Sequence, residues 1–266
     1  MCMQEKNILN KYKKLLGQYC AINQFVELTK RCFVSEHADE IKSKERFVSL
    51  ATQRSITLTE YDSERIVDLI SKSYIVNIHL CFETFLKELC LLLHKYGKTE
   101  FTEKNQEDSW LKCAVKNIFP KGTPQEIKAL VDICEYYRLI RNSSVHDLCN
   151  IDNRTKEFIG LSKYNFKTDA KFKKLSAPNN FEQISYDDFI MFARSTLELA
   201  EYLFKNVSYD YTKIISCAPS SVQSKWKKFS QKRREQAICA YIKSNYKINT
   251  SLEEQLPYLA NKIMAQ

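Results

Sequence analysis

Residues that end helices and form tight turns are scarce in this sequence. Its 266 residues include only 4 Gly and 5 Pro. A sheet of many strands needs such residues at most of its connections, and a phosphate-binding loop needs several glycines close together. The composition therefore argues against a protein built of strands and against a Gly-rich nucleotide site. It favours helices.

Metal ligands and cofactor-binding patterns are also few. The 4 His are dispersed and the 10 Cys include no C-x-x-C pair, whereas zinc sites need ligands at short, regular spacing. Neither G-x-x-x-x-G-K-[ST] nor G-x-S-x-G occurs, and these patterns mark common nucleotide-hydrolase and esterase sites. We expect no metal and no cofactor, and we expect reduced cysteines that pack as small apolar side chains.

Long apolar runs are missing as well. No run approaches the roughly 18 apolar residues of a membrane span, and the opening M-C-M-Q-E-K-N is polar and charged, unlike a signal peptide. We therefore expect a cytoplasmic protein with no membrane partner. Apolar residues nevertheless make up 44% of the chain, which is enough to bury one substantial core.

Positive charge is present in excess and is gathered near the C-terminus. Lys and Arg number 41 against 32 Asp and Glu, for a net charge of +9. The segment from Lys225 to Lys247 has one acid, Glu235, and its candidate RNA-binding residues are Lys225, Lys227, Lys228, Lys232, Arg233 and Arg234. A polyanion such as RNA would suit this segment. A solvated helix face would explain the basic run equally well.

Apolar residues recur at helical spacing over most of the chain. The longest such segment runs from about 61 to 96 and ends at Gly97, and others run from about 123 to 146, 187 to 204 and 223 to 244. Between about 150 and 180 the pattern weakens, and we expect an insertion there, as a loop or a short hairpin. The sequence thus predicts an all-α protein.

We expect three parts in this helical protein. An N-terminal helical segment, residues 1–60, should pack on a helical bundle formed by residues 61–207. A basic helical extension, residues 208–266, should follow the bundle.

The stretch R-L-I-R-N-S-S-V-H-D, from Arg138 to Asp147, concentrates polar groups at the end of one expected helix. Residues four apart stack on one ridge of a helix, so Arg138, Asn142 and His146 should form a row with Arg141 beside it. Such a row can face a cleft without disturbing the apolar face. On its own, the stretch would be explained by a solvated surface with an ordinary structural histidine.

The segment R-N-S-S-V-H resembles the R-x4-H motif, with a polar residue after the arginine, of the HEPN superfamily of all-α domains. The order of elements is similar too, with V-N-I-H-L-C-F-E-T-F-L-K-E-L-C before the motif and Y-D-D-F-I-M-F-A-R-S-T-L-E-L-A-E-Y-L after it. The resemblance spans about residues 61 to 207. It implies a metal-independent ribonuclease site completed across a homodimer, as in many toxins and effectors of bacterial defence.

Carried onto this chain, the resemblance assigns catalytic roles to Arg141, Asn142 and His146, with Glu83 and Arg138 as supporting residues. The chemistry agrees, because metal-free RNA cleavage needs a group that titrates near pH 6.5 to move a proton and fixed cations to stabilise the phosphorane. We expect an endoribonuclease that leaves a 2′,3′-cyclic phosphate, restrained by an antitoxin or sensor protein. The alternatives are a non-catalytic HEPN-like module that binds nucleic acid or protein, and a helical adaptor.

Overall fold

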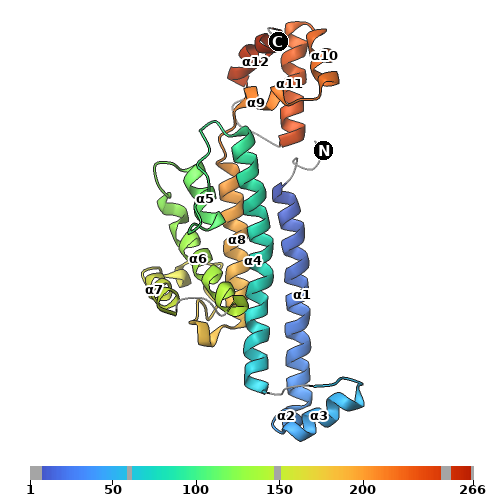
Figure 1. Ribbon diagram of the computed structural model, residues 1–266, viewed down its shortest axis with the longest axis vertical. Coiled ribbons are helices and arrows are strands. Elements are labelled where there is room, and N and C mark those ends of the chain that lie inside the picture. The colour runs from blue at the N-terminus through green and yellow to red at the C-terminus, as the bar shows by residue number, and fades with distance from the viewer. Residues whose placement is uncertain (1–7, 59–61, 147–150, 247–252, 265–266) are drawn as a thin grey trace. The chain divides into compact units, whose positions relative to one another are not determined.

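The computed structural model describes residues 8–58, 62–146, 151–246 and 253–264 (Figure 1). Regular structure in these residues is helical, apart from an isolated antiparallel bridge between Gly97 and Tyr209. The predicted all-α class is therefore confirmed. The α-helices are α1 (Ile8–Glu36), α2 (Ala38–Ile41), α3 (Lys44–Gln53), α4 (Ser63–Tyr96), α5 (Trp110–Ile118), α6 (Gln125–His146), α7 (Ile151–Leu161), α8 (Tyr186–Lys205), α9 (Tyr211–Ser216), α10 (Ser220–Lys227), α11 (Gln231–Tyr246) and α12 (Leu256–Met264).

Helices α4, α6 and α8 confirm three of the helices expected from periodicity, and two other expectations need correction. Residues 150–180 hold no hairpin in their described part, since α7 occupies Ile151–Leu161 and a short 3-10 turn follows at Phe166–Thr168. The single basic helix expected at about 223–244 is two helices, α10 and α11, with a break at residues 228–230. The expected boundary at residues 60–61 and the start of the insertion at 150 lie outside the described residues.

Gly97 ends α4 for a steric reason. A Cβ atom at this position would lie 2.4 Å from the carbonyl oxygen of Leu93, which no side chain could tolerate without a shift of the backbone. The chain then turns into the bridge with Tyr209, where Lys98 N donates to Ser208 O at 3.0 Å and Asp210 N donates to Tyr96 O at 2.8 Å. The sequence prediction of a stop at Gly97 is therefore correct.

The described residues group by their contacts into two compact units. The first contains the described parts of Met1–Lys11, Phe85–Gly122 and Tyr202–Gln266, and the second contains those of Tyr12–Thr84 and Thr123–Glu201. Helices α1, α4 and α8 each contribute to both units. The three parts expected from the sequence, divided near residues 60 and 207, are a different kind of division from these contact-based units, and they stay a prediction.

In the second unit, a polar cluster fixes α1 against α4. The Glu27 carboxylate on α1 accepts from the Tyr74 hydroxyl at 3.2 Å, and Asn23 on α1 accepts from Asn77 Nδ2 at 2.9 Å. Glu27 and Asn23 are both buried. Since a slip along the helix would leave buried polar groups without partners, this cluster fixes the register of the two helices.

Helix α6 is held against α8 by a buried carboxylate in the same unit. Asp188 is 0% exposed and accepts from the Tyr137 hydroxyl at 2.8 Å, while Asn179 and Ser185 donate to it from the preceding loop. The ring of Tyr137 also packs on Phe192 of α8, with centroids 4.9 Å apart. These contacts hold the apolar side of α6 against α8.

Candidate active site

The expected catalytic residues lie on the last two turns of α6. Arg141 Nη1 donates to Asn142 Oδ1 at 3.1 Å and lies 3.4 Å from His146 Nε2. Arg141 and Asn142 are half-buried, and His146 is exposed. The structure therefore brings together the three side chains that the motif singled out, in a cluster around one guanidinium.

The two arginines of the stretch have different partners. Arg138 Nε lies 2.9 Å from a carboxylate oxygen of Glu135, one turn earlier, and the Glu135 side chain is almost fully buried. Within the described residues no carboxylate lies within ion-pair distance of Arg141. Arg138 is thus engaged in an ion pair with a buried carboxylate, and the described residues place no such partner beside Arg141.

The contact between Arg141 and His146 defines which imidazole nitrogen holds the proton. A guanidinium can only donate hydrogen bonds, so His146 Nε2 must accept when this contact forms. The neutral ring then carries its hydrogen on Nδ1. In this form the lone pair of Nε2 faces a permanent cation, and a hydroxyl group that takes the place of this contact can pass its proton to Nε2.

Glu83 lies on α4, where its Oε2 is 3.9 Å from Nδ1 of His79. His79 is buried. The side chain of His94, near the end of the same helix, is 60% exposed. The role of Glu83 as a supporting acid stays a prediction.

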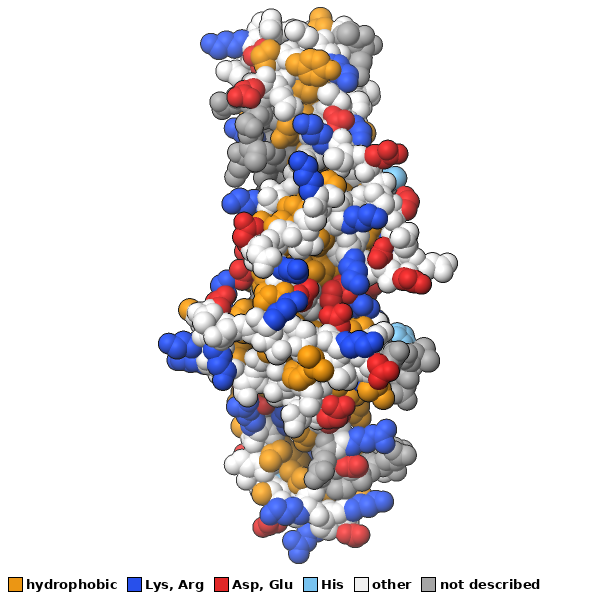
Figure 2. All heavy atoms as spheres, turned by 90° about the vertical axis from the view of Figure 1, so that its left-hand side faces the viewer, with side chains coloured by type: hydrophobic (Ala, Val, Ile, Leu, Met, Phe, Trp, Pro, Cys, Tyr) orange, Lys and Arg blue, Asp and Glu red, His pale blue; other side chains and the backbone are white. Residues whose placement is uncertain are grey.

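Most of the basic residues near the C-terminus are exposed, and they come from two helices. Lys225 and Lys227 belong to α10, Lys228 follows it, and Lys232 and Arg233 belong to α11. On the face in Figure 2, Lys and Arg side chains are interspersed with Asp and Glu over most of the surface. Exposure of these five side chains is compatible with contacts to a polyanion.

The assignment of Arg234 to RNA binding is wrong. Its side chain is buried, with 6% of the residue exposed. Its Nε donates to the carbonyl oxygen of Trp226 at 2.9 Å, and its Nη2 donates to that of Phe229 at 2.7 Å. Arg234 therefore stabilises the break between α10 and α11, and its guanidinium is not presented to solvent.

Sequence reasoning missed Arg154 of α7, which has no acidic partner within the described residues. It is buried, its guanidinium lies 3.8 Å above the ring of Phe181, and its Nε has no hydrogen-bond partner in the same part of the chain. Lys72 Nζ is also 3.8 Å from the same ring centroid and is paired with Asp68 at 2.7 Å. The available signal was the four-residue spacing of Arg154 and Phe158, which places the arginine on the inward side of a helix that was expected to be a loop.

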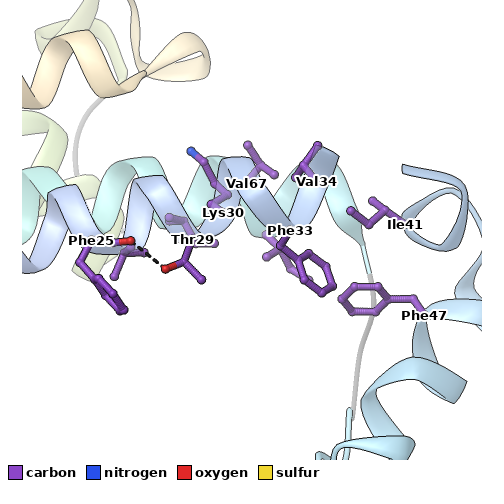
Figure 3. A pocket seen from close by; sticks show the side chains of 11 residues that line it. Phe25, Thr29, Lys30, Phe33, Val34, Ile41, Phe47 and Val67 are labelled. Carbon is purple, nitrogen blue, oxygen red and sulfur yellow. Dashed lines mark hydrogen bonds between the residues drawn. The ribbon is translucent and has the colours of Figure 1, made fainter. Parts of the chain in front are cut away.

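An apolar cavity of about 390 Å³ lies in the second unit, away from the polar stretch of α6 (Figure 3). Helix α1 contributes Phe25, Val26, Thr29, Lys30, Phe33 and Val34, and the remaining wall comes from Ile41, Phe47, Ile66, Val67 and Ile70. Among the described lining residues the polar side chains are Thr29 and Lys30, and Lys30 Nζ already lies 2.5 Å from Glu27. This lining has no free charge for a phosphate.

Comparison with protein-family models, curated proteins and solved structures finds no match for this chain. The described residues contain no group of three His, Cys, Asp or Glu side chains placed to hold a metal ion. None of the described helices combines the length and apolar character needed to cross a membrane. The geometry of α6 is therefore the basis on which a function is proposed.

Proposed function

We propose that the chain is a metal-independent endoribonuclease of HEPN type, in which Arg141, Asn142 and His146 form the active site. The observation that carries this proposal is the guanidinium of Arg141, which has no acidic partner in the described residues and lies 3.4 Å from the accepting nitrogen of His146. A fixed cation beside a base is the pair that phosphodiester cleavage by an internal hydroxyl requires.

The mechanism follows from these groups. Arg141 holds a phosphate oxygen and stabilises the charge that develops in the phosphorane. His146 Nε2 takes the proton from the 2′-hydroxyl, whose oxygen attacks the adjacent phosphorus. The bond to the 5′-oxygen breaks, and this oxygen receives a proton to become a 5′-hydroxyl, which leaves a 2′,3′-cyclic phosphate on the other fragment. DNA, which lacks the 2′-hydroxyl, is not a substrate.

Asn142 and a second copy of the site complete this proposal. The Asn142 carboxamide accepts from Arg141 at 3.1 Å and so orients the guanidinium. One histidine cannot at the same instant accept the 2′-hydroxyl proton and protonate the leaving oxygen, and a second His146 across a homodimer would supply the second function. We place the protein in the cytoplasm as a toxin or defence effector restrained by an antitoxin or sensor protein.

Incubation of the purified protein with total RNA in EDTA tests activity, metal dependence and site together. The wild type should cut RNA and leave cyclic phosphate ends, and His146→Ala should not. His94→Ala is a matched control, because His94 is also exposed at the end of a long helix. A requirement for a divalent metal, 3′-hydroxyl products, or full activity in His146→Ala would overturn the mechanism. RNA binding without cleavage would instead favour a non-catalytic module.

A further inference from the structure

Helix α1 has a row of exposed residues on the side opposite its buried face, and this row is called the seam below. The buried face of this helix includes Leu16, Asn23 and Glu27. Another set recurs at alternating spacings of four and three residues, and every member is exposed: Lys14, Gln18, Ala21, Phe25, Leu28 and Cys32. Alternating steps of four and three residues are the a/d repeat of a coiled-coil seam.

The centre of this seam is strongly apolar for a solvent-facing surface. Phe25 is 69% exposed and Leu28 is 61% exposed, and the neighbouring Ile22 is 53% exposed. Phe25 lies at the end of the apolar cavity farther from Phe47 (Figure 3). Single exposed apolar residues are common, but a contiguous stripe on one helix face is typical of an interaction surface.

We propose that α1 pairs with α1 of a second copy of this chain, in antiparallel orientation, through this seam. A twofold symmetric contact needs a surface that is complementary to itself. The seam meets this need, since its apolar residues lie in the middle, the basic Lys14 lies at one end, and the acidic Glu36 lies past the other end.

Charge decides the orientation of the two helices. In a parallel pair, Lys14 would face Lys14 and Glu36 would face Glu36. In an antiparallel pair, Lys14 comes close to the last turn of the other helix, where Glu36 lies together with the negative end of the helix dipole. Like charges across an interface are repelled and opposite charges attracted, so antiparallel pairing is favoured.

The seam also fixes the register. Antiparallel coiled coils place an a residue of one helix against a d residue of the other, and the register that buries both large side chains places Phe25 against Leu28. The same register places Ala21 of one copy level with Cys32 of the other. The seam lies on α1 and the proposed active site on α6, so this interface does not depend on the proposed ribonuclease function.

Light scattering at micromolar concentration tests the interface. Phe25→Asp and Leu28→Asp should each halve the mass of the wild-type assembly, while the helix content measured by circular dichroism stays unchanged because both side chains are exposed in the single chain. Leu91→Asp is the matched control, since Leu91 is 68% exposed on α4, and it should keep the wild-type mass. A wild-type monomer, unchanged mass in the seam variants, or a halved mass in Leu91→Asp would each overturn the proposal.

Disulfide formation tests the orientation. Under mild oxidation Ala21→Cys should link position 21 to Cys32 of the second copy, identified by mass spectrometry of the linked peptides, and wild type should form no Cys32–Cys32 link. An efficient Cys32–Cys32 link in wild type would show a parallel pair and overturn the orientation.

Lys14→Glu should weaken the dimer at least tenfold at low salt, and the double variant with Glu36→Lys should restore it. Failure of that rescue would also contradict the antiparallel pair.

Discussion

Arg138 and Arg141 stand three positions apart on α6, yet their guanidiniums have different surroundings. Arg138 is bound by the nearly buried Glu135, and Arg141 contacts only Asn142 and His146 among the described residues. Arg141→Ala should therefore lower the rate of RNA cleavage by about two to four orders of magnitude, since it removes a cation that stabilises the transition state. Its melting temperature should stay near that of wild type.

Arg138→Ala is the paired control, and we expect the opposite result. Its cleavage rate should stay within a few-fold of wild type, while its melting temperature should fall because the variant removes the 2.9 Å ion pair with the nearly buried Glu135 carboxylate. Single-turnover kinetics and thermal melting on the same preparations check both variants. Equal losses of rate in Arg138→Ala and Arg141→Ala would contradict the claim that only Arg141 stabilises the transition state.

The Glu27 carboxylate should make the stability of the folded state depend on pH, and the direction of this dependence follows from its pKa. Burial raises the pKa of this group, but hydrogen bonds from Lys30, Arg31 and Tyr74 outweigh it and hold the pKa below its ordinary value of 4.5. The folded state thus binds the proton less readily than the unfolded state. Stability from this group is present above about pH 4.5 and is lost as the pH falls further. Glu27→Gln should flatten this part of the stability curve in urea titrations between pH 3 and 6, with Glu100→Gln, at an exposed position after α4, as a control.

At the scale of elements, the sequence correctly predicted the helices that have a repeating apolar face. It did not predict the elements whose ends depend on contacts between residues farther apart in the chain. Helices α4, α6 and α8 have long apolar repeats, whereas α7 has few apolar residues and was expected to be a loop. The break between α10 and α11 contains neither Gly nor Pro, and the bonds from Arg234 to Trp226 and Phe229 that stabilise it join residues five and eight apart. The absence of Gly and Pro is why the sequence analysis did not predict this break.

Because of the break, substitutions of Arg233 and of Arg234, which are adjacent in α11, should have different effects, the first on RNA binding and the second on stability. Charge reversal at the exposed Lys232 and Arg233 should weaken RNA binding and flatten its dependence on salt by roughly one unit per lost phosphate contact. Arg234→Ala should instead lower the free energy of unfolding by about 1–3 kcal/mol, since the buried carbonyl group of Trp226 and the part-buried one of Phe229 lose a charged donor. Filter binding at several salt concentrations and urea unfolding separate the two effects. An unchanged salt slope in the Lys232 and Arg233 variants would identify these residues as an ordinary solvated face.

At the scale of the molecule, the sequence supported the helical class and the grouping of Arg141, Asn142 and His146, because both follow from spacing along one helix. The ion pair of Arg138 was missed, although the three-residue spacing from Glu135 in the sequence allows that inference. The exposure of the α1 seam also needed the structure, since apolar residues cover two faces of that helix and only packing shows which face is buried.

The predicted homodimer with paired sites has a consequence for the concentration dependence of activity. If the catalytic site needs His146 from two chains, the rate per chain should fall on dilution below the dissociation constant of the dimer. Mixing Arg141→Ala with His146→Ala should restore none of the activity if each site needs both residues from one chain, and a measurable part if they come from different chains. Phe25→Asp separates the two interfaces: full activity in this variant would mean that the α6 sites pair independently of α1. A rate per chain that stays constant over a thousandfold dilution to a monomer would show that one copy of Arg141, Asn142 and His146 is sufficient.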